Sequence, residues 1–147
     1  MLKDQGNAAY KAADVPLAVE SYKKALSYMR FVFPEEEKDQ TQINNIRLVC
    51  YLNLAACQIR TRDYVGAKKS CSDALYLDPG NVKALYRRAQ ASAATMDFDR
   101  AKRDIISAIK LAPSDQALRQ EFLNIKQGEE DYEKRAKEAM AQMFGAK

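Results

Sequence analysis

The feature that most limits how this chain can fold is an internal repeat with a period of 34 residues. Its two clearest copies align Asp63-Tyr64-x-x-Ala67, Cys71, Ala74, Leu77 and Pro79 with Asp97-Phe98-x-x-Ala101, Ile105, Ala108, Leu111 and Pro113. An earlier copy comprises Gly6-Asn7-Ala8, Asp14-Val15-x-x-Ala18, Tyr22 and Ala25. The step from Ala18 to Ala67 is 49 residues, which is one period plus an insertion of 15, and the insertion falls between two predicted helices that flank Pro34. Three repeated units result, and such units bury their core against their neighbours along the chain.

The spacing of small and large side chains within each unit predicts a pair of packed helices. A small side chain has to lie where two helices cross, and Ala18, Ala67 and Ala101 take that position. Asp63 and Asp97 can cap the second helix of their pairs, and a Pro can end it. A helix-turn-helix repeat of this length is the signature of the tetratricopeptide (TPR) repeat. The sequence therefore predicts an all-α fold of three TPR repeats in a right-handed superhelix, followed by a long C-terminal capping helix.

We expect six helices in the repeats and a seventh after them. The expected repeat helices span residues 2–13, 15–32, 42–61, 64–77, 81–95 and 98–111. The domain organisation that follows is a TPR part over residues 1–113, with repeats at about 2–32, 42–79 and 81–113, and a capping and extension helix over residues 114–147.

The last helix is expected to begin after Ser114, which serves as its N-cap. The apolar stripe that is expected to cover the open face of the last repeat consists of Leu118, Phe122, Ile125, Tyr132, Met140 and Met143. Beyond Gly128 the sequence is mostly charged, and we expect this part to project from the body.

The composition removes several classes of function. The sequence has no His, which excludes Ser-His-Asp and Cys-His catalytic arrangements and His metal ligands. Of its three cysteines, Cys50 and Cys57 are about 10 Å apart along one predicted helix, too far to pair. The sequence has no apolar signal segment, no Asn-x-Ser/Thr sequon and no run that could span a membrane. We therefore expect reduced, mostly buried thiols in a soluble protein of the cytoplasm, with the nucleus as a second compartment, and neither a cofactor nor a metal.

Basic residues gather in the middle of the chain. The net charge is +4, but residues 47–88 carry eight basic and three acidic side chains, a balance of +5. Such an imbalance is by itself usual for a solvated face. An anionic ligand is nevertheless expected to meet this part of the chain and the residues that face it.

Five polar residues fall on the first helix of each repeat, the helices that line the concave groove of a TPR stack. Lys3 and Asn7 are one turn apart, Lys83 and Arg87 repeat this spacing, and Asn53 precedes Arg87 by one 34-residue period. Lys and Arg supply charged donors and Asn amides complete the shell, so the set suits a pair of carboxylates. Each residue also has an ordinary explanation on its own, because a Lys can simply be solvated and an Asn can serve helix packing. The five in register, with no acid among them, favour a binding site.

Several segments of the chain resemble the carboxylate-clamp TPR domains of co-chaperones. They are Lys3-Asp4-Gln5-Gly6-Asn7, Leu52-Asn53-Leu54-Ala55-Ala56-Cys57 and Asn81-Val82-Lys83-Ala84-Leu85-Tyr86-Arg87-Arg88-Ala89-Gln90. The long insertion after Tyr22-Lys23-Lys24-Ala25-Leu26, the phrase around Pro34-Glu35-Glu36-Glu37 and the terminal Met143-Phe144 resemble the C-terminal part of large FKBP-type immunophilins. The resemblance covers nearly the whole chain.

This resemblance implies a module that binds the C-terminal Met-Glu-Glu-Val-Asp peptide of heat-shock protein 90, and in second place the tail of heat-shock protein 70. The clamp positions, which hold the terminal carboxylate and the last Asp side chain, correspond to Lys3, Asn7, Asn53, Lys83 and Arg87. Tyr10 matches a position that borders the peptide, although aromatic core packing explains it equally well. The immunophilins carry an upstream prolyl isomerase domain, and no such segment occurs in these residues. The chain itself is therefore not expected to be an enzyme, whereas a peptidyl-prolyl cis-trans isomerase is expected as its parent.

Other functions have weaker support in the sequence. No glycine-rich phosphate loop, Gly-x-Ser-x-Gly motif or carboxylate pair in an apolar setting indicates an enzyme. The end of the last helix, from Lys134 to Phe144, is a candidate calmodulin target, but Glu133 and Glu138 weaken its basic face. Nucleic-acid binding is disfavoured because the basic middle lacks interleaved aromatic residues. A TPR scaffold for a different protein partner is the remaining alternative, and no membrane partner is expected.

Overall fold

The computed structural model describes residues 2–11, 14–32 and 35–145, and within these ranges it contains helices and no strand. The helices are α1 (Leu2–Lys11), α2 (Val15–Met29), α3 (Glu37–Arg60), α4 (Tyr64–Leu77), α5 (Val82–Ala94), α6 (Phe98–Leu111) and α7 (Gln116–Met143). The all-α class therefore agrees with the prediction. None of the helices in the described ranges is long and apolar enough to cross a membrane.

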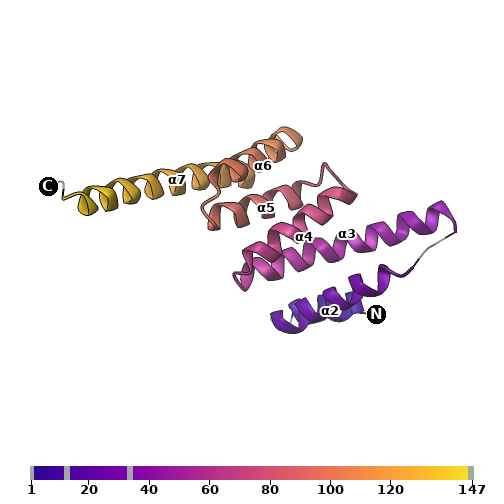
Figure 1. Ribbon diagram of the computed structural model, residues 1–147. Coiled ribbons are helices and arrows are strands. Elements are labelled where there is room, and N and C mark those ends of the chain that lie inside the picture. Colours follow the sequence, from indigo (N-terminus) through magenta and orange to yellow (C-terminus); the bar gives the residue numbers. More distant parts are fainter. Residues whose placement is uncertain (1, 12–13, 33–34, 146–147) are drawn as a thin grey trace.

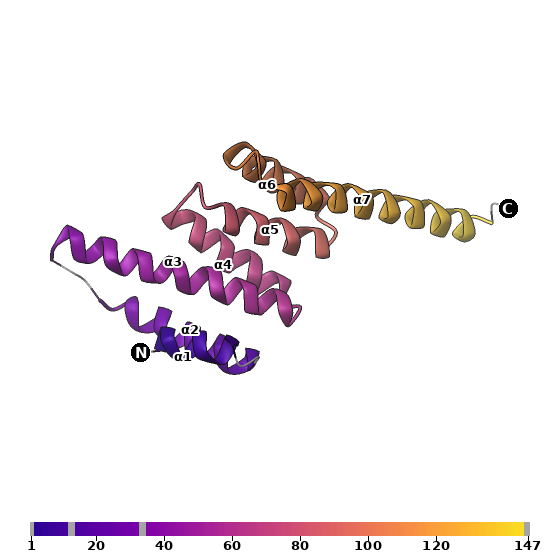
Figure 2. The same ribbon diagram turned by 180° about the vertical axis from the view of Figure 1, so that it is seen from behind.

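The helices stack in two layers. Each helix packs on the next one along the chain, as Figure 1 and the view from behind in Figure 2 both show. In addition, α1 contacts α3, α3 contacts α5, and α5 contacts α7. We call α1, α3, α5 and α7 the odd layer and α2, α4 and α6 the even layer. The first helix of every predicted repeat thus lies in the odd layer.

The second helix of each unit begins with the same capping interaction. Asp14, Asp63 and Asp97 each precede the first residue of α2, α4 or α6. The side chain of each Asp accepts a hydrogen bond from the backbone N–H three residues later, over distances of 3.2, 3.0 and 3.4 Å. The predicted capping by Asp63 and Asp97 is confirmed.

The third helix starts earlier than predicted. It begins at Glu37 rather than at residue 42, so much of the insertion lengthens α3 to 24 residues instead of forming a loop. Glu37 and Asp39 lie in its first turn, where acidic side chains favour the positive end of the helix dipole. Pro34, on which the prediction placed the insertion, lies outside the described residues.

The last helix differs from the prediction at its N-cap. Its N-cap is Asp115, which accepts a hydrogen bond of 3.0 Å from the backbone of Ala117, whereas Ser114 lies in a turn closed by the bond from Asp115 N–H to the Ala112 carbonyl. The predicted capping by Ser114 is therefore wrong.

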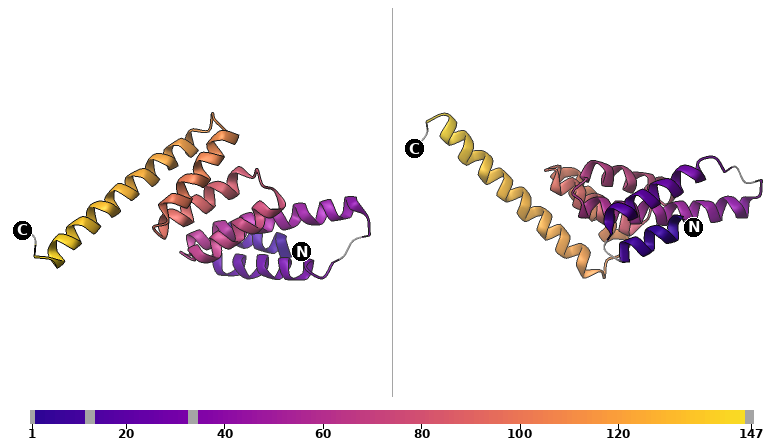
Figure 3. Two further views of the ribbon diagram at one scale, coloured as in Figure 1. Left: turned by 45° about the horizontal axis from the view of Figure 1, so that its top comes forward. Right: turned by 90° about the horizontal axis from the view of Figure 1, so that it is seen from below.

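The apolar stripe of α7 covers the last repeat only over its first half. Leu118 and Ile125 are buried against α5 and α6, and Phe122 is partly buried. Tyr132 is half-exposed, but the centre of its ring lies 5.9 Å from that of Phe98 on α6. Met140 and Met143 are exposed, so the prediction that these two methionines also cover the repeat is wrong. The reason is length, because α7 has 28 residues and spans about 42 Å, twice the extent of the 14-residue α6. Its second half extends beyond the stack, as expected for residues after Gly128 (Figure 3).

Small residues lie at the helix crossings, as predicted. Ala18, Ala67 and Ala101 are completely buried. The remaining core divides into a cluster around Tyr22, Cys50 and Leu54 near the N-terminus and one around Phe98, Ile105 and Ile125 near the C-terminus. The three cysteines are free and buried, in agreement with the prediction. Burial raises the pKa of the Cys50 thiol to about 11 and that of the Cys71 thiol to about 12, so neither is a reactive thiolate at neutral pH.

Candidate functional site

Two of the predicted site residues make direct contact across the odd layer. The Nδ2 of Asn53 on α3 donates a hydrogen bond of 3.1 Å to the Oδ1 of Asn7 on α1. The hydroxyl of Tyr22, on α2, donates a second hydrogen bond to the same oxygen. Because both bonds end on Oδ1, the Asn7 amide is held in one orientation. Within the part of the chain that the structure describes, the Nδ2 of Asn7 has no partner and remains a donor.

The backbone of α1 approaches the Tyr22 ring very closely at Gly6. A Cβ atom at this position would lie 2.7 Å from the Cε1 atom of Tyr22 and 2.9 Å from its Cδ1 atom. Only glycine permits this approach without displacing the ring. Because Gly6 has no side chain, α1 lies close enough to Tyr22 for the next residue, Asn7, to reach its hydroxyl.

Tyr22 supports Asn7 from the core, a contact that the sequence analysis does not predict because the repeat pattern marks Tyr22 only as a core position. The side chain is 1% exposed, and burial raises the pKa of its hydroxyl to about 12. The hydroxyl therefore stays protonated and donates to Asn7 over the whole physiological pH range. A signal was present in the alignment, because the corresponding positions of the other two units hold Cys71 and Ile105, which lack a hydroxyl.

The third helix of the layer is tied to the second by Arg87. Its Nη1 donates a hydrogen bond of 2.8 Å to the backbone carbonyl of Leu52, the residue before Asn53. Arg87 is half-buried, and its positive charge opposes the rise in the pKa that burial causes at the Cys57 thiol on α3. The guanidinium of α5 is thereby fixed beside Asn53.

The two lysines of the predicted set lie one helical turn from this contact. Lys3 is half-buried on α1. Burial raises the pKa of the Cys50 thiol on α3, and the positive charge of Lys3 opposes this rise, so Lys3 lies near α3. Lys83 is exposed on α5. Among the described residues, neither ammonium group has a hydrogen bond or ion pair. Asn7 thus bonds directly to Asn53, and Arg87 bonds to the backbone of α3 beside Asn53. Lys3 and Lys83 are cations on α1 and α5 without an ion pair among the described residues. We call these five residues the polar cluster.

Tyr10 lies on the same helix as Asn7 but makes a different contact. The guanidinium carbon of Arg60, at the end of α3, lies 5.3 Å from the centre of the Tyr10 ring, a cation–π arrangement. The ring is partly exposed and is absent from the N-terminal core cluster. Of the two explanations offered for Tyr10, core packing is therefore the weaker.

Comparison with known proteins relates the chain to one part of a larger enzyme. No protein-family model matches the sequence. The peptidyl-prolyl cis-trans isomerase FKBP4 of Mus musculus is 31% identical over 144 residues, which make up 98% of this chain and 31% of FKBP4. The chain thus spans about a third of the length of the curated relatives it matches.

Solved structures with the same fold include a TPR-containing domain, an Hsp90 co-chaperone and a myosin chaperone. The C-terminal TPR-containing domain of a protein assigned to the FK506-binding proteins of Plasmodium falciparum has a TM-score of 0.82 and 28% identity over 90% of this chain and 89% of that one. The Hsp90 co-chaperone Cns1 of Saccharomyces cerevisiae has a TM-score of 0.77 and 29% identity over 98% of this chain and 42% of Cns1. The myosin chaperone UNC-45 of C. elegans, solved in complex with an Hsp90 peptide, has a TM-score of 0.71 and 28% identity over 88% of this chain and 13% of that protein.

These similarities confirm the predicted TPR fold and the predicted resemblance to the TPR domains of FKBP-type co-chaperones. The chain is a TPR helical domain with a long C-terminal helix, homologous to the C-terminal region of FKBP4. Such a domain is not catalytic, and the similarity to FKBP4 covers the TPR region rather than an isomerase domain. The functional site of this chain is therefore a binding surface.

Proposed function

We propose that this chain is a chaperone-binding TPR module that takes the C-terminal Met-Glu-Glu-Val-Asp peptide of heat-shock protein 90 through the polar cluster. The observation that carries the proposal is the linkage of α1, α3 and α5 by Asn7, Asn53 and Arg87, with Lys3 and Lys83 one turn away. The co-chaperone Cns1 and the peptide complex of UNC-45 support the same class of partner. A location in the cytoplasm follows from this partner.

The chemistry of the cluster matches the end of such a peptide. A C-terminal Asp presents its terminal carboxylate and its side-chain carboxylate within a few ångströms of each other. The cluster offers the Nδ2 donor of Asn7, the guanidinium of Arg87 and two ammonium groups, with no acid among its members. Charge-assisted hydrogen bonds contribute about 1.5 to 3 kcal/mol each before ordering costs. A five-residue peptide should therefore bind with a Kd on the order of micromolar.

The hydrogen bonds that already fix Asn7 favour peptide binding by the polar cluster over a role as an ordinary solvated surface. Asn7 is held in one orientation from behind by Tyr22 and from the side by Asn53, so little freedom is lost when a ligand accepts from its Nδ2. Tyr10, held at Arg60, lies one turn further along α1 and is a candidate for contact with residues upstream of the terminal Asp. The tail of heat-shock protein 70 ends in the same charged groups and is the second expected ligand.

Calorimetric titration with the free-acid peptide and with its C-terminal amide tests the proposal. The amide removes one of the two carboxylates and should bind more weakly by about tenfold or more, and about 1 M salt should weaken the free acid. A parallel titration with the heat-shock protein 70 tail compares the two chaperones. Equal affinity for acid and amide would contradict the clamp and make the polar cluster an ordinary solvated face.

A further inference from the structure

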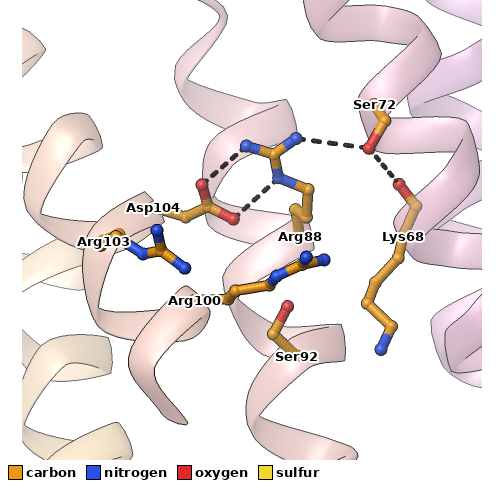
Figure 4. A pocket seen from close by; sticks show the side chains of 7 residues that line it. All are labelled: Lys68, Ser72, Arg88, Ser92, Arg100, Arg103 and Asp104. Atoms are coloured by element: carbon orange, nitrogen blue, oxygen red, sulfur yellow. Dashed lines mark hydrogen bonds and ion pairs between the residues drawn. The ribbon is translucent and has the colours of Figure 1, made fainter. Parts of the chain in front are cut away.

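A second polar site lies on the other side of α5, away from the polar cluster. Arg87 and Arg88 are neighbours in sequence, but Arg87 reaches α3 whereas Arg88 reaches Ser72 on α4 and Asp104 on α6. A cavity of about 370 Å³ lies between these three helices, and Figure 4 shows the side chains that line it. The cavity therefore belongs to the junction of α4 with the last helix pair and has no residue in common with the polar cluster.

Positive charge dominates the lining of this cavity. Four cationic side chains, Lys68, Arg88, Arg100 and Arg103, face one acid, Asp104. Asp104 is largely buried and accepts two hydrogen bonds of 2.8 Å from Arg88, so its charge is matched by that single guanidinium. Hydrogen bonding to Asp104 also raises the pKa of Arg88. Three further cations are left without an acid of their own inside the cavity.

Lys68, Arg100 and Arg103 have at most a neutral partner or an exposed ion pair among the described residues. The ammonium group of Lys68 donates to the hydroxyl of Thr95 over 3.0 Å, which supplies no charge. Arg100 lies 3.5 Å from Asp97 in an exposed pair, and such pairs contribute little. Arg103 has no hydrogen bond or ion pair with any residue in the described ranges. A bound anion would reduce the mutual repulsion of these groups.

A hydroxyl group also lines the cavity. Ser92 on α5 is 1% exposed and contributes to the cavity wall. A hydroxyl can donate a hydrogen bond to an anion and accept one from a cation. Ser92 therefore adds a neutral donor to the cationic lining.

The preceding repeat has a related cavity with a different lining. This cavity of about 460 Å³ lies between α2, α3 and α4 and contains five of the residues 34 positions earlier. Leu54, Gln58, Gly66, Lys69 and Ser70 there correspond to Arg88, Ser92, Arg100, Arg103 and Asp104. Gln58 accepts a hydrogen bond of 2.7 Å from Ser70. Two acids, Asp63 and Asp73, line this cavity beside four cations, whereas the cavity of the later repeat has one acid beside four cations. In the later repeat, Ser92 is shorter than the equivalent Gln58. Arg88 and Arg100 replace Leu54 and Gly66.

From this geometry we infer that the cavity between α4, α5 and α6 binds a small anion that contains two or more linked phosphate groups. Guanidinium groups match phosphate oxygens with paired hydrogen bonds, and Ser92 supplies a neutral donor. A cavity of about 370 Å³ is roughly ten times the volume of one water molecule, which leaves room for more than one phosphate. Inorganic oligophosphate and the diphosphate of a nucleotide share this chemistry.

Calorimetric titration of the chain with inorganic pyrophosphate at about 150 mM salt tests the inference, with Arg103→Gln as the variant. Arg103 is exposed, so this change should not unfold the chain. Lys69→Gln is the matched control, because it removes the same charge from the equivalent position of the preceding repeat. We expect Arg103→Gln to weaken pyrophosphate binding by about tenfold or more and Lys69→Gln to leave it unchanged. Equal losses in both variants, or no binding to the unmodified chain, would overturn the inference.

Further titrations show where the anion binds and whether it is an inorganic phosphate or a nucleotide. Lys83→Ala, in the polar cluster, should leave pyrophosphate binding intact, and a loss there would place the anion in the cluster and overturn the inference. Arg103→Gln should leave binding of the Met-Glu-Glu-Val-Asp peptide unchanged, which separates this site from the proposed function. Comparison of ADP with pyrophosphate then distinguishes the sources, since tighter binding of ADP indicates a nucleotide and tighter binding of pyrophosphate indicates an inorganic ligand.

Discussion

At the scale of single residues, the Asn7 amide shows how a binding group can be prepared by residues that never touch the ligand. Its orientation depends on the hydroxyl of Tyr22, and Tyr22 reaches it because Gly6 has no side chain. Asn53 then connects this arrangement to α3. The affinity of the surface is therefore expected to respond to changes behind it as well as to changes in the residues that face the peptide.

Tyr22→Phe tests this support. The change removes one buried hydrogen bond, so we expect a loss of about 1 kcal/mol in the free energy of unfolding. We also expect several-fold weaker peptide binding, because the Asn7 amide loses one of the two hydrogen bonds that fix its orientation. Thermal melts and calorimetry measure the two effects. Tyr76→Phe is the control, since Tyr76 is 88% exposed and should change neither. Unchanged affinity in Tyr22→Phe would show that the orientation of Asn7 does not matter.

Lys83→Ala tests the cationic side of the cluster without disturbing the fold. Lys83 is exposed and has no ion pair among the described residues, so its loss should leave the melting temperature unchanged. Peptide binding should weaken by about 2 kcal/mol, roughly 30-fold, because a partly desolvated carboxylate loses its partner. Lys110→Ala, another exposed lysine, should leave affinity unchanged. A similar loss in both variants would point to general electrostatic attraction.

Arg87→Ala should reduce peptide affinity to a similar degree but also affect the fold. Its guanidinium donates to the Leu52 carbonyl between α5 and α3, and the loss of that bond should cost about 0.5 to 1.5 kcal/mol of unfolding free energy. Denaturant titration measures this cost beside the calorimetric affinity. A variant that binds weakly at full stability would mean that the Leu52 contact contributes nothing.

At the scale of the helices, α7 combines two parts with different environments. Its first half closes the core of the last repeat, where Ile125 is 2% exposed. The boundary lies near two contacts with α6, the 2.9 Å ion pair between Lys102 and Glu129 and the tilted contact between the rings of Phe98 and Tyr132. Residues 133–140 of α7, beyond these contacts, are all exposed. Stability should therefore depend strongly on the first half and little on the second.

Ile125→Ala and removal of residues 136–147 should differ sharply in stability. Truncating a fully buried Ile costs about 2 to 5 kcal/mol, and loss of an exposed helix end costs little. Leu123→Ala is the matched control on the same helix, because Leu123 is 58% exposed. Phe122→Ala should fall between Ile125→Ala and the control, since the ring is only partly buried. Urea unfolding of the four variants measures the order, and a large loss from the truncation would mean that the end of α7 packs in solution.

The elements that sequence could predict are those that the repeat specifies. Helices α4 and α6 were predicted at residues 64–77 and 98–111, as observed, because an Asp cap and a following Pro mark both ends. The start of α3 was missed because the insertion has no counterpart in the other repeats. The exposure of Met140 and Met143 was missed because periodicity shows which residues share a face but not whether another helix lies opposite.

For the polar cluster, the same reasoning found the residues but not their contacts. Register along the repeats brings Asn53 and Arg87 to equivalent positions, which arithmetic on the sequence can show. The bond from Arg87 to the Leu52 carbonyl and the bond from Tyr22 to Asn7 depend on distances between helices. The spacing of residues along one helix does not specify these distances.

At the scale of the whole molecule, each helix in the described ranges contacts the next helix along the chain or the one after it, and none further away. Helix α1 has ten residues and contacts α2 and α3, so it has the least support among the repeat helices. The two core clusters lie at opposite ends, one around Tyr22 and one around Ile105. In such an arrangement the ends can open while the rest stays folded. A ligand that contacts α1, α3 and α5 together would act against opening of the N-terminal end.

Hydrogen exchange of the free and peptide-bound chain should reveal this effect. In the free chain we expect the amides of α1 to exchange faster than those of α4 and α5, because α1 opens locally. Binding of the free-acid peptide should slow exchange in α1 and α3 in proportion to its saturation, since the ligand stabilises only the closed form. The amides of α6 and of the exposed half of α7 should not change, and the amidated peptide should give little protection at the same concentration. Protection confined to α5 and α7 would mean that the peptide does not reach Lys3 and Asn7, and the polar cluster would then not act as one site.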